Sequence, residues 1–212
     1  MKKFELGFAF AGSIMTIIFL TLTNYLTSPQ YLWFIYPAFV LLLWPIGLYC
    51  TRKGKHKLLS FLHSALIITF LISENVLFSP EYPWVLYAIY PILWWPILAS
   101  LGSRAKLMTT AWVGSISIIL YYLVLNIFLA PGYPWVIYPA FVVLWWPLSL
   151  YHAQKKTYFK YSLHATFLIT VFFILVNFVS SPHTIWAVYP IFCVLWWPLS
   201  MYYFVHKRRM LN

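Results

Sequence analysis

The sequence predicts an all-α integral membrane protein of eight transmembrane helices, built as four parallel helical hairpins. Three observations predict it: a 51-residue repeat, an apolar composition, and positive charges confined to alternate loops. Hydrophobic residues make up 63% of the 212 residues and charged residues 8%, whereas a soluble domain carries about 25% charge. Lipid is therefore the expected solvent for most of the chain.

Marker residues recur in steps of 51 without insertion or deletion. A fixed period of this length indicates one supersecondary unit used four times. We expect a single membrane domain over residues 1–212, with repeat units 1–51, 52–102, 103–153 and 154–212 in a pseudo-fourfold or paired pseudo-twofold arrangement. The markers are Asn24, Asn75, Asn126 and Asn177; Trp33, Trp84, Trp135 and Trp186; Tyr36, Tyr87, Tyr138 and Tyr189; and Trp44, Trp95, Trp146 and Trp197.

Each unit contains an apolar span, a short turn, a second span and a basic loop. A run of about 20 residues crosses the hydrocarbon core as a helix. A closed barrel is the alternative, but its strands would alternate apolar and polar residues, and segments such as 14–20 do not. Lys2 and Lys3 precede the first span, but no cleavage site ends it, so we expect it to be retained. The predicted spans are 7–27, 32–50, 58–79, 84–101, 109–130, 135–152, 161–181 and 185–204.

The distribution of charge predicts the orientation of the helices. All 14 Lys and Arg lie at the ends of the hairpins, whereas the four turns carry only Glu81. The positive-inside rule therefore places both termini in the cytoplasm. The net charge of +11 indicates contact with anionic lipid head groups. It is spread over short loops, so no nucleic-acid partner is expected.

The second span of each unit carries an aromatic stripe. Trp135, Tyr138, Val142 and Trp146 are separated by three, four and four residues, which places them on one helix face. Tryptophan also prefers the membrane interfaces, and this explains part of the pattern. We expect the four stripes to contact a lipid, a hydrophobic small molecule or a partner's transmembrane helix.

Prolines in the second spans suggest a role for the repeated Asn. Pro139 and Pro147 have no backbone N–H to donate to the carbonyls of Trp135 and Val143. In lipid such carbonyls need another partner. Asn126 is expected near the depth of Trp135, where its amide would donate to the freed carbonyl within its own hairpin. The alternative is a ring of four amides around a polar cavity.

Acidic residues are rare, which excludes several kinds of chemistry. Glu5, Glu74 and Glu81 are the only ones, and there is no Asp. A paired-carboxylate hydrolase or a carboxylate metal site is therefore not expected. Glu74 is expected at head-group level, reaching water. The alternative for Glu74 is a proton or cation site, since an ionisable group within a span is a functional candidate.

No metal site and no cofactor are expected. The candidate ligands are His63 and His164, which lack a matched spacing and a nearby acid to orient them. His152, beside a basic loop, is expected to be solvated. Cys50 and Cys193 are expected at different depths, so a disulfide is not predicted.

The pattern of Asn, Trp, Tyr-Pro and Trp-Trp-Pro over residues 24–45, 75–96, 126–147 and 177–198 resembles the bacterial two-transmembrane domain family, here in four tandem copies. An early His, which is typical of that family, has candidates in His63 and His164, and its trailing His matches His152. The resemblance implies helical hairpins in a bacterial cytoplasmic (inner) membrane and an accessory role beside sensory or signalling proteins.

Two function classes follow. Nucleophile, phosphate-loop and zinc-protease motifs are absent, so no catalytic residue and no enzymatic activity are expected. The first class is a non-enzymatic membrane module, with an accessory, sensor or immunity-type role, whose partners are membrane lipids or another membrane protein. The alternative is a small channel or transporter with a central pathway lined by the repeated Asn residues.

Overall fold

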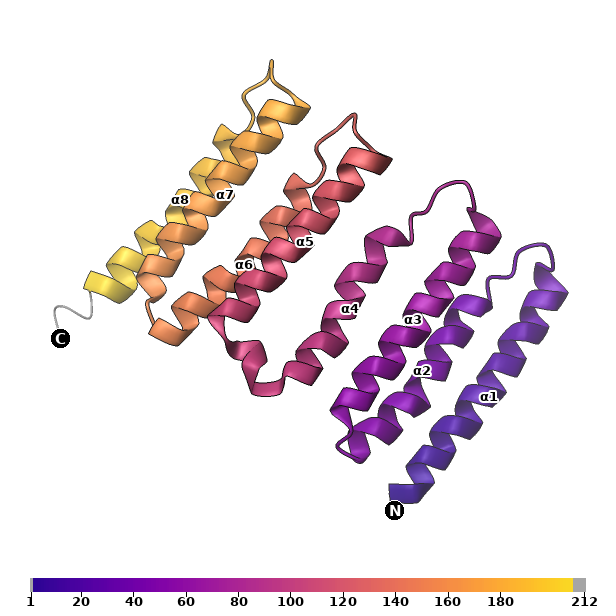
Figure 1. Ribbon diagram of the computed structural model, residues 1–212. Helices are drawn as coiled ribbons and strands as arrows, with labels where there is room; N and C mark the ends of the chain where they lie inside the picture. The colour runs from indigo at the N-terminus through magenta and orange to yellow at the C-terminus, as the bar shows by residue number, and fades with distance from the viewer. Residues whose placement is uncertain (1, 208–212) are drawn as a thin grey trace. The chain divides into compact units, whose positions relative to one another are not determined.

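The computed structural model describes residues 2–207, so residue 1 and residues 208–212, at the ends of the first and last predicted repeat units, lie outside it. The described residues form eight α-helices and contain no strand. A 3₁₀ helix, Gly102–Lys106, precedes α5, and a π-helical segment, Tyr202–Lys207, follows α8. The α-helices are α1 (Lys2–Thr27), α2 (Ile35–Arg52), α3 (His56–Phe78), α4 (Leu86–Leu101), α5 (Met108–Leu129), α6 (Ile137–Lys155), α7 (Tyr158–Ser180) and α8 (Val188–Met201) (Figure 1).

Seven helical segments of the described chain are long and apolar enough to cross a membrane, as in a multi-pass membrane protein. Helix α6 is not among them. Its sequence combines Tyr, Trp and Pro with His152, Gln154 and Lys155 near its end, and these residues lower its mean hydropathy. The all-helical prediction is confirmed, whereas the count of eight spans stays a prediction.

The helices overlap the predicted spans, although α1 begins at Lys2 and not at residue 7, and one difference is systematic. The second helix of each hairpin begins later than predicted, as at Ile35 instead of residue 32 and at Ile137 instead of residue 135. The intervening residues continue the turn through short backbone hydrogen bonds, such as Trp135 N–H to Tyr133 C=O at 2.8 Å. Sequence hydropathy includes these residues in the span because they are apolar, although they are not helical.

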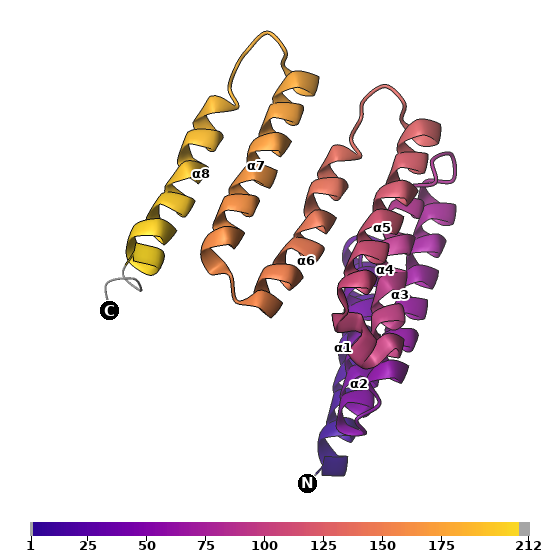
Figure 2. The same cartoon turned by 60° about the vertical axis from the view of Figure 1, so that its left-hand side comes forward.

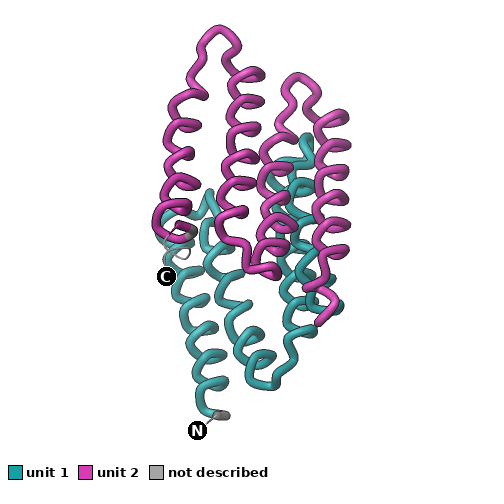
Figure 3. The backbone as a smooth tube through the Cα atoms, turned by 90° about the vertical axis from the view of Figure 1, so that its left-hand side faces the viewer, with its two compact units in different colours: residues 1–101 teal, residues 102–212 magenta. Residues whose placement is uncertain are grey.

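The chain divides into two compact units, residues 1–101 and 102–212, here called unit 1 and unit 2 (Figure 3). Within each unit the main packing joins each helix to the one before it and the one after it, as the row α5, α6, α7 and α8 shows in Figure 2. Such a row leaves broad helix faces uncovered, and large apolar side chains such as Phe8, Leu120 and Phe128 are exposed on them. These faces suit contact with lipid.

Serine hydroxyls donate hydrogen bonds to the backbone carbonyls that prolines leave without a helical partner. Ser115 Oγ donates to the Val143 carbonyl at 2.9 Å, which is the carbonyl that Pro147 leaves without its helical partner. The same bond joins Ser13 to the Leu41 carbonyl, four residues before Pro45, at 2.9 Å. Ser64 donates to the Ile92 carbonyl, four before Pro96, at 3.3 Å. Each hairpin of this kind is held together near its middle.

In the fourth hairpin the corresponding residue is Thr166. Its side chain is buried, at 6% exposure, and its Oγ1 has no hydrogen-bond partner among the described residues. The serines and this threonine lie 51 residues apart in the sequence. This series was not predicted from the sequence, although its spacing and its position relative to each Pro are visible there.

Consecutive hairpins within a unit pack through stacked phenylalanines. In unit 1, Phe39 of α2 stacks on Phe70 of α3 with ring centroids 4.2 Å apart. In unit 2, Phe141 of α6 stacks on Phe172 of α7 at 4.0 Å. Stacked aromatic pairs contribute about 0.5–1.5 kcal/mol beyond the area they bury. The α2–α3 and α6–α7 contacts are thus built in the same way.

Candidate functional site

The four repeated Asn close the turns of their own hairpins. Asn126 Nδ2 donates to the carbonyls of Ala130 at 2.7 Å and Tyr133 at 2.8 Å. Its Oδ1 accepts from the Val136 N–H at 3.1 Å. Equivalent bonds surround Asn24, Asn75 and Asn177. All four side chains are buried.

The Asn bonds lie within each hairpin, as predicted, but their acceptors differ from the predicted ones. The Trp135 carbonyl accepts from the Tyr138 N–H at 3.1 Å and needs no amide. Pro139 lies in the first turn of α6, where an N–H would have no helical partner in any case. The carbonyl freed by Pro147 is instead bonded by Ser115. Both amide donors of each Asn are used locally, which leaves none for a polar cavity.

Tryptophans of the aromatic stripes pack against the first helix of their own hairpins. Near the turns, Trp135 packs edge-on against Tyr122 at 5.8 Å and Trp186 against Phe173 at 6.1 Å. The equivalent Trp33 and Trp84 are half-buried. At the far ends of the helices Trp44 and Trp95 are exposed, while Trp146 and Trp197 are half-buried. Trp197 contacts the ring of Tyr161 at 5.7 Å.

The stripe tyrosines bond mainly to neighbours at the turns. Tyr138 and Tyr87 pair through their hydroxyls with Tyr133 and Tyr82, whereas Tyr189 is exposed. The hydrogen bond with Tyr138 raises the pKa of the Tyr133 phenol, and burial and the neighbouring Tyr138 charge act in the same direction. These contacts strengthen the turns of their own hairpins.

Glu74 was predicted to reach water, but its side chain is buried in the structure. It is 9% exposed and accepts a hydrogen bond from the Tyr36 hydroxyl at 2.9 Å. Glu74 lies on α3 and Tyr36 on α2, so the bond joins two consecutive hairpins of unit 1. The expectation of a solvated carboxylate was wrong because α2 packs over the face of α3 that carries it.

His152 is not solvated, contrary to the prediction. It is 2% exposed, and its Nε2 lies 2.9 Å from His164 Nδ1. Its Nδ1 lies 2.6 Å from Thr157 Oγ1. The end of α6 turns back onto the start of α7 through Thr157, and this buries the imidazole. The contact could not be predicted from the sequence, because the two histidines lie on different helices and the conformation of the loop between them was not predicted.

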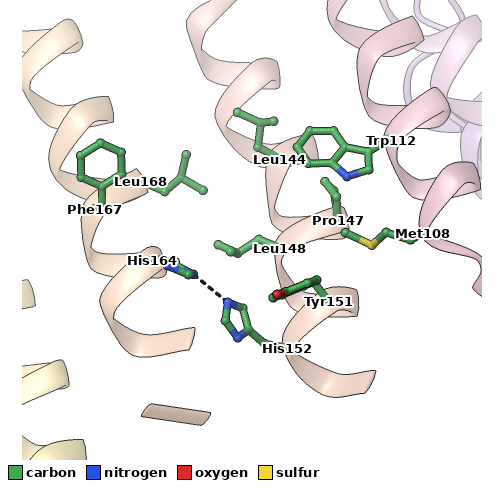
Figure 4. A pocket seen from close by; sticks show the side chains of 10 residues that line it. All are labelled: Met108, Trp112, Leu144, Pro147, Leu148, Tyr151, His152, His164, Phe167 and Leu168. Carbon is green, nitrogen blue, oxygen red and sulfur yellow. Dashed lines mark hydrogen bonds between the residues drawn. The ribbon is translucent and has the colours of Figure 1, made fainter. Parts of the chain in front are cut away.

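The His152–His164 pair stands at the edge of a pocket of about 500 Å³ between α5, α6 and α7 (Figure 4). The volume falls within the range of about 300–1,000 Å³ that small-molecule sites occupy. Apart from the histidines and Tyr151, the lining is apolar. It comprises Met108, Trp112, Leu144, Pro147, Leu148, Phe167 and Leu168. Of the predicted site residues, the pocket includes only His164.

A cation lies beside this pocket. Lys155 Nζ is 3.2 Å from the Tyr151 hydroxyl and 4.7 Å from the centre of its ring. Gln154 Nε2 donates to the Lys106 carbonyl at 2.9 Å and fastens the end of α6 to the segment before α5. The polar end of the pocket is thus also the basic end of the helices.

Unit 1 has a separate pocket of about 550 Å³ between α2 and α3. Trp44, Gly47 and His63 are among its lining residues. His63 Nδ1 lies 3.1 Å from the Leu59 carbonyl of its own helix, and its ring is 5.9 Å from that of Trp95. His63 therefore makes different contacts from His164, which pairs with His152.

Within residues 2–207, no group of three or more His, Cys, Asp or Glu is arranged to hold a metal ion. Cys50 and Cys193 are both free, the first buried and the second exposed. Comparison of the chain with protein families, with curated proteins and with solved structures yields no match.

Proposed function

We propose that this protein is a non-enzymatic module of a bacterial cytoplasmic membrane that holds a lipid or a hydrophobic small molecule in the pocket of unit 2. The observation that carries the proposal is the pocket between α5, α6 and α7, which is apolar along its walls and polar at the His152–His164 end. Such a lining matches an amphiphile with an apolar body and a polar head.

The topology belongs to the same proposal. We infer eight spans in four hairpins, with both termini in the cytoplasm and the turns outside. The likeness of the Asn, Trp and Tyr-Pro pattern to the two-transmembrane domain family supports this organisation and an accessory role. The local bonding of each Asn amide favours the module over a channel, since a pathway needs polar groups that face its axis.

Native mass spectrometry of the full chain, extracted gently from its own membrane, tests the proposal. We expect a co-purifying lipid or small molecule that is lost in Leu148→Trp, because the larger ring fills the pocket. Leu120→Trp is the control, since Leu120 is exposed on α5 and does not line the pocket. Equal retention in both variants contradicts the proposal, and ion flux in liposomes would then favour the channel.

A further inference from the structure

A positive charge lies beside the polar end of the unit 2 pocket. Tyr151 lines the pocket and holds Lys155 through a hydrogen bond of 3.2 Å and a cation–π contact of 4.7 Å. His164 also lines the pocket and is exposed, and its Nδ1 is engaged by His152. Nε2 is thus the remaining polar atom of its ring. An occupant of the pocket meets apolar walls and, at one end, an imidazole nitrogen, the Tyr151 hydroxyl and a nearby cation.

Unit 2 supplies no acid to balance this charge. Residues 102–212 contain no Asp and no Glu, and their basic residues are Arg104, Lys106, Lys155, Lys156, Lys160, Lys207, Arg208 and Arg209. Unit 1 differs, because Arg52 at the end of α2 forms an ion pair with Glu5 at the start of α1. A carboxylate side chain paired with Lys155 would have to come from outside unit 2.

We propose that the pocket binds one anionic phospholipid. Its phosphate contacts Lys155 and His164, and an acyl chain lies along Trp112, Phe167 and Leu168. The inference rests on the proposed membrane-module function and names the ligand class. A charge-assisted hydrogen bond to phosphate is about twice as strong as a neutral one. A zwitterionic lipid carries the same phosphate, but its own cation competes with Lys155, so a net negative head group is preferred.

The polar end is specific to unit 2. Two repeats earlier in the sequence, Cys50 and Leu62 stand at the positions of His152 and His164. Cys50 is buried and Leu62 is apolar, so neither offers a polar group comparable to an imidazole for a phosphate. We therefore expect one selective lipid site for each chain.

The test uses the full chain in nanodiscs of equimolar phosphatidylglycerol and phosphatidylcholine, followed by native mass spectrometry. The wild type should retain one phosphatidylglycerol in preference to phosphatidylcholine by about tenfold, as one or two charge-assisted bonds allow. The double variant Lys155→Gln/His164→Leu should lose this preference. Lys207→Gln should keep it, because Lys207 lies 5.4 Å from the Tyr203 ring centre and does not line the pocket.

Equal retention of the two lipids by the wild type, or an unchanged preference in the double variant, overturns the anionic site. If Leu148→Trp still abolishes lipid retention in that case, the proposed module function stands without head-group selectivity. If Leu148→Trp changes neither lipid, both proposals fail. Thermal unfolding verifies that the variants fold, and should the double variant not fold, the exposed Lys155→Gln change alone decides the outcome.

Discussion

At the scale of single residues, side chains with small polar groups stabilise backbone that the helices leave open. Each turn-closing Asn satisfies two carbonyls and one N–H, and Ser13, Ser64 and Ser115 each satisfy a carbonyl freed by proline. A structural role for the Asn residues could be predicted from the sequence, because they recur every 51 residues. It did not show the acceptors, since these depend on turn geometry that hydropathy and periodicity do not encode.

Replacing Asn126 by Leu should lower the thermal stability of the protein in detergent. The change leaves two carbonyls and one N–H of a buried turn without their partner, and each such group costs about 1–3 kcal/mol unless water replaces the bond. Circular dichroism or dye-based melting measures the effect. Gln154→Leu, which removes one bond of an exposed amide, should change the melting temperature much less. An Asn126→Leu protein as stable as the wild type contradicts the role of the Asn.

Ser115→Ala and Thr166→Ala should differ in their effects, although they occupy equivalent positions of two hairpins. The Ser115 hydroxyl bonds to the Val143 carbonyl, whereas Thr166 Oγ1 has no partner in the described chain. Polar bonds between membrane helices contribute about 0.6 kcal/mol on average. We expect Ser115→Ala to lower the unfolding temperature and Thr166→Ala to leave it unchanged or raise it. Equal losses in the two variants would show that the hydroxyls do not act through these bonds.

At the scale of helices, the prolines and serines operate as pairs. Pro147 in α6 leaves the Val143 carbonyl without its helical partner, and Ser115 of α5 donates a hydrogen bond to that carbonyl. This bond holds the two helices of the hairpin together. The helices themselves could be predicted from apolar runs of sufficient length. Their contacts could not: the Glu74–Tyr36 and His152–His164 bonds each depend on which face of one helix meets its neighbour.

A double-mutant cycle tests this pairing. In Pro147→Ala the new N–H can donate to the Val143 carbonyl along the helix, so this carbonyl gains a donor besides Ser115. Ser115→Ala should therefore cost less in the Pro147→Ala background than in the wild type. Chemical or thermal unfolding of the four proteins gives the coupling energy, and neighbours that share a partner typically couple by about 0.5–3 kcal/mol. If the stability losses of the two changes simply add, Ser115 and Pro147 do not act on the same carbonyl.

At the scale of the whole molecule, each unit is a row of four helices whose broad faces are apolar and exposed. The one-sided distribution of Lys and Arg predicts how these rows cross the membrane. The helices could be predicted from the apolar runs, and their orientation from the positions of Lys and Arg, because both are visible in the composition along the chain. The division into units after Leu101 was not predicted, because the markers recur across that boundary without interruption.

Cysteine labelling in intact cells tests the orientation. In a Cys50→Ala/Cys193→Ala background, Gly132→Cys in a turn should react with a membrane-impermeant maleimide added outside. Ser103→Cys in a basic loop should react only after the membrane is permeabilised. Both positions are exposed, and a Cβ at Gly132 meets no atom within 4 Å. The reverse pattern would place the termini outside the cell.

The turn-closing Asn has a consequence for the biogenesis of the protein. All of its partners lie within the same turn, as between Asn24 and Phe34. A hairpin of this kind can close as soon as its second helix has left the ribosome, without waiting for later hairpins. Such contacts between residues close in sequence form early and at a small entropic cost. A gene that grows by copying this segment would gain a complete insertion unit at each step.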